Sequence, residues 1–141
     1  ASGADVTHWI IKEFDKKERF NASFNSLNCV TPTGGNKDGY SIRVAVEELR
    51  KRPERKKFLI VLSDGLPSDY PSADAGQEDV RQAVHMARKQ QIEVIPIMFG
   101  SKAFQSVSLP AFQRMYEKNI ITSSVEHITE DLAKLFKRLV V

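Results

Sequence analysis

The feature that most constrains the fold of this chain is an unbroken apolar segment at residues 58–62. It reads Phe-Leu-Ile-Val-Leu and stops at Ser63, Asp64 and Gly65. A run without polar alternation is typical of a strand buried on both faces, as in a parallel sheet covered by helices. In open α/β sheets, ligands bind beyond the carboxyl ends of the strands. The sequence therefore places Asp64 where a ligand such as a metal ion would bind.

The composition indicates one domain of ordinary size, which we expect to span residues 1–141. Of the 141 residues, 41% are hydrophobic, and the net charge of +3 gives no electrostatic argument for nucleic acid. The single cysteine, Cys29, excludes an internal disulfide and a cysteine-based zinc cage, and it fits a reducing compartment such as the cytoplasm. Since no run approaches the ~20 apolar residues of a membrane span, we expect no membrane association.

Strand and helix patterns alternate along the chain. Strands are predicted at residues 8–14, 58–62, 92–99 and 119–123. Helices are predicted at residues 18–28, 39–52, 77–91, from 108 onward and from 129 onward. A turn-rich loop of about a dozen residues should precede the helix at 77–91. This alternation predicts an α/β fold with a mostly parallel central sheet flanked by helices.

Capping residues set the expected starts of the last two helices. Ser108 is predicted to cap a short helix with Pro110 in its first turn. Thr129 is predicted to cap the final helix. The apolar stripe of that final helix is expected to comprise Leu132, Leu135, Phe136 and Leu139.

Oxygen-bearing side chains gather in two loops beside predicted buried elements. Asn36 and Asp38 precede the helix at 39–52, and Ser63 and Asp64 follow the strand at 58–62. Together these four could bind Mg²⁺, which prefers oxygen ligands and keeps several waters. Two plainer interpretations stay open: Asp64 as an ordinary Asp-Gly turn residue, and Asp38 as the N-cap of the following helix.

Signatures of catalysis are weak in this sequence. The three histidines are scattered, and neither a nucleophile elbow nor a phosphate-binding glycine loop occurs. The basic run at residues 50–57 lies at a predicted helix end and lacks interleaved aromatic residues. A solvated helix terminus explains that run better than a nucleic-acid site does.

Several segments in fixed order resemble the von Willebrand factor A domain. They are Thr-Gly-Gly-Asn-Lys-Asp-Gly at 33–39, FLIVLSDGLPSD at 58–69, a helix opened by Glu78 and Asp79, IEVIPIMFG at 92–100, and a closing Thr-Glu-Asp-Leu helix. Within that family the chain is similar to the C-terminal domains of the nitric oxide reductase activation protein NorD and the cobaltochelatase subunit CobT. The resemblance implies a Rossmann-like fold that binds a partner and does not catalyse a reaction.

The resemblance also implies a metal-ion-dependent adhesion site, in which an acidic group of the partner completes the coordination of Mg²⁺, Mn²⁺ or Ca²⁺. Asp64 would be its carboxylate ligand, and Asn36 stands where many members have threonine. Asp38 and Ser63 would complete the set. The partner, by resemblance, is an AAA+ ATPase of the MoxR or chelatase type, and the parent protein would insert or activate a metal centre. The expected docking residues are Gly34, Gly35, Gly65, Leu66, Pro67, Ser68 and Asp69.

One departure from the family is the lack of its Asp-x-Ser-x-Ser motif. We therefore expect a partial domain without the family's first strand and helix, with weak or absent Mg²⁺ binding. Open strand edges invite pairing, so a homodimer or a swapped segment would compensate. There are two alternatives. One is a metal-free adaptor; the other, which the sequence favours less, is a metal-dependent phosphoryl-transfer or hydrolytic enzyme that uses Asp64.

Overall fold

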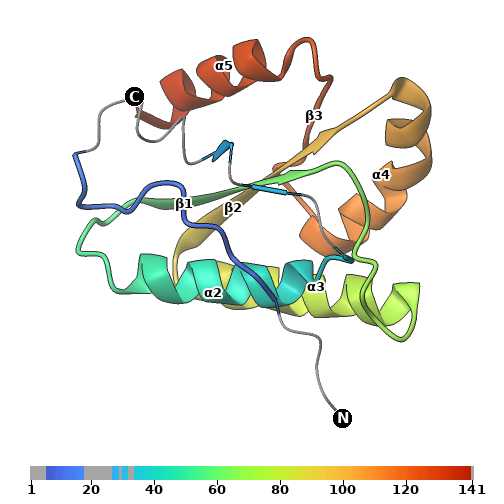
Figure 1. The fold of residues 1–141 in the computed structure, drawn as a ribbon, viewed down its shortest axis with the longest axis horizontal. Helices are drawn as coiled ribbons and strands as arrows, with labels where there is room; N and C mark the ends of the chain where they lie inside the picture. Colours follow the sequence, from blue (N-terminus) through green and yellow to red (C-terminus); the bar gives the residue numbers. More distant parts are fainter. Residues whose placement is uncertain (1–5, 18–26, 29, 32–33, 141) are drawn as a thin grey trace. The chain divides into compact units, whose positions relative to one another are not determined.

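The computed structural model describes residues 6–17, 27–28, 30–31 and 34–140. The chain divides into two compact units, Ala1–Gly35 and Asn36–Val141, which are described separately here. The helices and strands labelled in Figure 1 belong to the second unit.

The first unit forms no strand among its described residues, so the strand predicted at 8–14 is wrong. Three large apolar side chains of this segment are half or more exposed: Trp9 at 50%, Ile10 at 73% and Phe14 at 61%. A high β-propensity needs a hydrogen-bonded neighbour to become a strand, and the described part of this unit supplies none. The helix predicted at 18–28 lies outside the described residues except for positions 27 and 28.

The second unit contains a parallel sheet whose strands follow the order of the chain. The strands are β1 (Lys57–Ser63), β2 (Ile92–Phe99) and β3 (Ile121–Ser123). The β1–β2 register runs from Lys57 opposite Ile92 to Ser63 opposite Met98, and β3 joins β2 at its carboxyl end. The strands predicted in these regions and the parallel α/β class are confirmed, and the carboxyl ends of all three strands share one edge.

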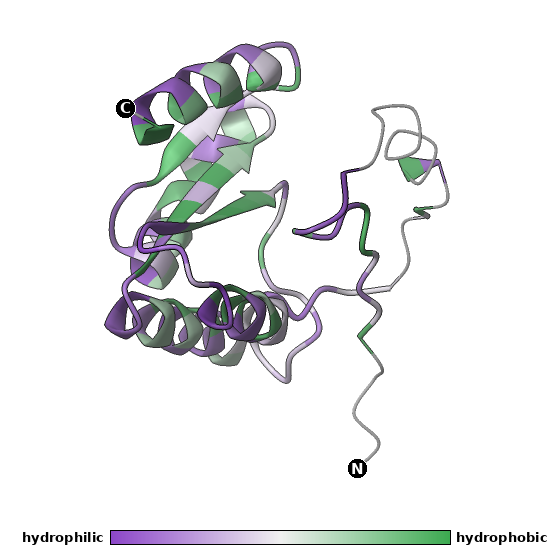
Figure 2. Ribbon diagram, turned by 90° about the vertical axis from the view of Figure 1, so that its left-hand side faces the viewer, coloured by the Kyte–Doolittle hydropathy of each residue, from purple (hydrophilic) through white to green (hydrophobic). Residues whose placement is uncertain are grey.

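Helices cover both faces of this sheet (Figure 1). On one face lie α2 (Asp38–Arg50), α3 (Ala73–Lys89) and α4 (Lys102–Tyr116), and on the other lies α5 (Ile128–Val140). Successive residues of β1 alternate between these two layers, because Leu59 and Val61 pack against the three-helix core while Phe58 and Ile60 pack with α5. Figure 2 shows the hydrophobic character concentrated in the strands that these helices cover.

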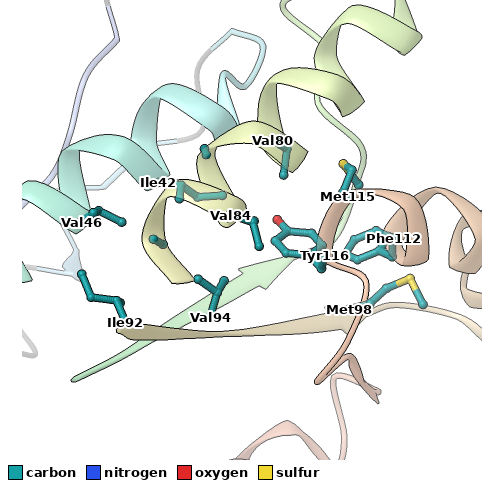
Figure 3. Packing of buried hydrophobic residues seen from close by; sticks show 12 residues of the cluster. Ile42, Val46, Val80, Val84, Ile92, Val94, Met98, Phe112, Met115 and Tyr116 are labelled. Atoms are coloured by element: carbon teal, nitrogen blue, oxygen red, sulfur yellow. The ribbon is translucent and has the colours of Figure 1, made fainter. Parts of the chain in front are cut away.

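The larger core joins all three helices of the first face to β2 (Figure 3). Val46 and Val84 are fully buried there, and the rings of Phe112 and Tyr116 stack with centroids 5.7 Å apart. The smaller core lies under α5 and centres on Leu135. The buried residues of α2 and α3 recur at helical spacing, as Ile42 with Val46 and Val80 with Val84 do.

Two helices begin earlier than their sequence predicted. Helix α3 begins at Ala73 and not at 77, because the Ser72 Oγ accepts a hydrogen bond from the Ala75 backbone N at 3.1 Å. The irregular loop is therefore confined to residues 64–72. Helix α4 begins at Lys102 because Ser101 is its cap, which makes the predicted Ser108 cap wrong: Ser108 is buried in mid-helix, and Pro110 lies well inside α4.

The last helix also differs in detail from its prediction. It begins at Ile128, whose backbone N donates to the Ser124 carbonyl at 2.9 Å, so Thr129 is a helical residue and not the cap. Of the predicted stripe, Leu135 is buried, but Phe136 is 51% exposed and does not belong to the buried face.

A strained residue follows α3 and yields a stability prediction. Gln91 has a φ of 60°, in the left-handed region that costs a residue with a Cβ about 1 kcal/mol. Gln91→Gly should therefore raise the free energy of unfolding, measured by urea denaturation, by up to about 1 kcal/mol. The control is Gln90→Gly, because Gln90 has a φ of −92° and should gain nothing. A loss of stability in Gln91→Gly would contradict this account.

Candidate functional site

The two loops predicted to form a site are joined in the structure by Asn36 and Ser68. The Oδ1 of Asn36 accepts hydrogen bonds from the backbone N of Ser68 at 3.0 Å and from its Oγ at 2.7 Å. The backbone carbonyl of Asn36 also accepts from the N–H groups of Ser68 and Asp69, both at 3.3 Å. We call this set of bonds the Asn36–Ser68 clamp. It holds the start of α2 beside the loop that follows β1.

The other end of the Asn36 amide faces Asp38. Its Nδ2 donates to the Asp38 Oδ1 at 2.9 Å. Asp38 is the first residue of α2, and the N-cap is Lys37, which makes no side-chain capping bond. The interpretation of Asp38 as a helix cap is therefore wrong, and its carboxylate is turned toward the site loops.

Asp38 and Asp64 form a pair of like charges beyond the end of β1. Burial raises the pKa of the Asp38 carboxyl, the hydrogen bond from Asn36 lowers it, and the negative charge of Asp64 raises it again. Asp64 itself is exposed. Two carboxylates that repel each other at such an edge favour a nearby positive charge.

Ser63 serves the turn between β1 and the loop. Its Oγ donates to the Gly65 carbonyl at 2.6 Å, and the Gly65 backbone N lies 3.4 Å from the same oxygen. These bonds fit the plainer interpretation of Ser63, Asp64 and Gly65 as a tight turn.

A hydrated divalent cation needs fewer protein ligands than a closed metal cage does. Mg²⁺ is usually held by one or two carboxylates and keeps several waters. Asp38 and Asp64 provide two carboxylates, whereas the Asn36 oxygen is engaged by Ser68. The described residues contain no group of three or more His, Cys, Asp or Glu side chains that could hold a metal ion. The fit therefore rests on Asp38 and Asp64.

A second network links α2, α3 and the loop that follows β1, and no motif in the sequence indicated a chemical role for its members. The Tyr70 hydroxyl donates to Asp79 Oδ2 at 2.6 Å, and Arg43 Nη1 lies 2.8 Å from Asp79 Oδ1. Burial and the Asp79 carboxylate raise the pKa of Tyr70. A Cβ at Gly39 would collide with this carboxylate. Only glycine lets α2 approach α3 so closely here. A glycine at position 39, at the start of a helix, was therefore the one sign of this network in the sequence.

The loop at 64–72 is held at several points. Gly76 lets Tyr70 lie on α3, since a Cβ there would be 2.9 Å from the Tyr70 ring. Lys37 Nζ lies 3.7 Å from Asp69 Oδ2. Among the predicted docking residues of this loop, Pro67 is buried, Gly65, Leu66 and Asp69 are half-buried, and Ser68 is exposed. Gly34 and Gly35 are exposed in the first unit, so they are described apart from this site.

The Asp79 network should contribute measurably to stability. Tyr70→Phe removes a hydrogen bond to a charged acceptor and should lower the free energy of unfolding by roughly 1.5–3 kcal/mol. Gly39→Ala should lower it as well, by displacing the same carboxylate. Because both changes act on Asp79, their effects in the double variant should sum to less than the two single losses. Additive losses in chemical denaturation would show that the two contacts are independent.

The charged Asp38 side chain should lower the free energy of unfolding near neutral pH. Its folded pKa is raised, so the folded state holds this proton more tightly than the unfolded chain does. The resulting stability is present at low pH and is lost as the pH rises through the folded pKa. Asp38→Asn should therefore melt at a higher temperature than the native chain near neutral pH in EDTA, with no difference at ~pH 3. Glu48→Gln, on an exposed part of α2, is the control and should show no gain.

Comparisons with known proteins agree with this geometry. The family profile of the von Willebrand factor type A domain matches residues 2–134. The chain is 36% identical over 109 residues to the uncharacterized protein YojO of Bacillus subtilis, covering 77% of this chain and 17% of YojO. It is 33% identical over 86 residues to NorD of Stutzerimonas stutzeri, covering 51% and 14%, and 31% identical over 104 residues to NorD of Brucella suis, covering 72% and 16%.

The chain thus spans less than a fifth of the length of these relatives, at most 17%. No solved structure matches it. None of the described helices is long and apolar enough to cross a membrane. The family profile, the similarity to NorD proteins and the parallel sheet flanked by helices lead to one conclusion: this chain belongs to the von Willebrand factor type A domain family.

Proposed function

We propose that this domain is a protein-interaction module that docks through the edge beyond β1, with a weakly held divalent cation between it and its partner. The observation that carries the proposal is the juxtaposition of Asp38 and Asp64 beside the Asn36–Ser68 clamp. This edge lies at the carboxyl ends of parallel strands, where open α/β sheets bind ligands.

The residues at that edge would have separate roles in binding the cation and in positioning the loop. Asp38 and Asp64 would hold Mg²⁺, Mn²⁺ or Ca²⁺, which would supply a positive charge to an Asp or Glu of the partner. The Asn36–Ser68 clamp fixes the loop beside them and leaves Ser68 exposed at the proposed docking surface. We assign the domain no catalytic step.

We further propose a cytoplasmic setting and an AAA+ ATPase of the MoxR or chelatase type as the partner. The support is the similarity to NorD proteins and the family resemblance of the sequence. The parent protein would then help to insert or activate a metal centre.

A homodimer is a further part of this proposal. Among the described residues, β1 pairs only with β2, and Leu62 on it is 48% exposed. An unpaired strand edge invites pairing with a second copy or with a swapped segment.

A metal-free adaptor is the second candidate, and one observation favours it. The Asn36–Ser68 clamp and the Asp79 network hold the edge with protein contacts alone. A surface ordered in this way could bind a partner by shape and hydrogen bonding, without a cation.

Calorimetry and a pull-down separate these two candidates. We expect Mg²⁺ to bind weakly, with roughly millimolar affinity, and Asp64→Ala to abolish the binding. A MoxR-type ATPase from the source organism should be retained by the native chain and lost on addition of EDTA or in Asp64→Ala. The control is Glu48→Ala, which removes an exposed carboxylate of α2 and should change neither result.

Retention of the ATPase in EDTA and in Asp64→Ala would instead favour the metal-free adaptor. Tight Mg²⁺ binding that depends on Asp64 would overturn the expectation of a weak site. Loss of the ATPase from Glu48→Ala as well would show that net charge, and not the edge beyond β1, governs the contact.

A further inference from the structure

A basic groove lies at the opposite end of the sheet from the candidate site, where β1 and β2 begin. Its volume is about 360 Å³. Three lining residues, Arg55, Lys56 and Lys57, lead into β1, and Arg138 comes from the last turns of α5. The remaining lining residues are Phe58, Gln91, Glu93 and Leu139. The fold therefore brings cations from distant parts of the chain together around one concave surface.

The solvated helix end suggested by the sequence does not account for this groove. Helix α2 ends at Arg50, so residues 55–57 lie beyond it. The cations at the helix end have partners: Arg50 contacts Glu47 at 3.0 Å, and Lys51 contacts Glu48 at 3.1 Å. The cations of the groove therefore form a separate feature.

The groove has a surplus of positive charge. Within the part of the chain that the structure describes, no salt bridge joins a carboxylate to any of its four cations, Arg55, Lys56, Lys57 or Arg138. Its one carboxylate, Glu93, accepts a hydrogen bond from Asn119 Nδ2 at 3.2 Å. Arg55, Lys56 and Arg138 are exposed. Charges gathered on a concave surface focus their field on an incoming anion.

We propose that this groove binds an acidic peptide segment of a partner protein. Arg55 and Arg138 would each pair with a carboxylate of the peptide, since the planar guanidinium can bind both carboxylate oxygens. Phe58 and Leu139 are half-buried and give the groove apolar surface for the aliphatic parts of the peptide. The Gln91 amide can donate to and accept from a peptide backbone.

Other polyanions fit this groove less well. Single-stranded nucleic acids need aromatic surfaces on which bases stack, and the only aromatic residue of the lining is the half-buried Phe58. Glu93 would repel a continuous phosphate backbone, whereas a peptide can place an N–H or a basic side chain beside it. A membrane surface cannot enter a concavity of this size. The proposal does not depend on the metal-bridged docking at the other end of the sheet.

The test measures fluorescence anisotropy of a labelled peptide of alternating Glu and Gly residues at about 150 mM salt. A peptide with Gln in place of Glu is the reference ligand. Arg55→Gln with Arg138→Gln should weaken binding of the Glu peptide by about tenfold or more. Arg50→Gln with Lys51→Gln changes the net charge equally outside the groove and should weaken it by less than about twofold. Circular dichroism checks that both double variants fold.

Three results would overturn the proposal. The first is a native chain that binds the Glu peptide no more tightly than the Gln peptide. The second is an equal loss of binding in the two double variants, which would make the effect one of net charge. The third is tighter binding to single-stranded RNA, or to vesicles of phosphatidylserine and phosphatidylcholine, that is lost in the groove variant.

Discussion

The carboxylate of Asp79 occupies the space in which any residue other than glycine at position 39 would place its Cβ. This contact fixes the distance between the first turn of α2 and the second turn of α3. It also holds Tyr70 through its hydroxyl, and with it the loop that follows β1. The position of the candidate site relative to the sheet therefore depends on one small residue and one partly buried carboxylate, although neither belongs to the proposed ligand set.

Sequence patterns predicted β1 and β2 because both carry long apolar runs; β2 is almost entirely buried, whereas β1 is partly buried. They failed where a single side-chain contact decides the outcome: Ser72 and Ser101 start helices that periodicity alone begins later, and the segment at 8–14 has β-propensity without a partner strand. For the site, the order of the segments along the sequence predicted that the two loops lie together. It could not show that the Asn36 amide bonds Ser68, because that choice depends on tertiary geometry.

The two ends of the sheet differ in charge, although the net charge of the chain is only +3. Carboxylates gather beyond the strand ends, where the negative charge of Asp64 acts on Asp38. Cations gather where the strands begin. A domain with this separation carries a field that would orient an approaching charged partner before contact. The two proposed surfaces could therefore engage different partners, or different parts of one partner, at the same time.

The sheet order also bears on how the domain folds. Among the described residues, β1, β2 and β3 are neighbours in the same order as in the chain, so none of these three strands must insert between two that are already paired. Each step closes a loop of modest length around one helix, so the entropic cost of each closure stays small. These three strands can pair one at a time, and because β1 precedes β2 and β3 in the chain, it can serve as a template on which the two later strands assemble in turn during synthesis.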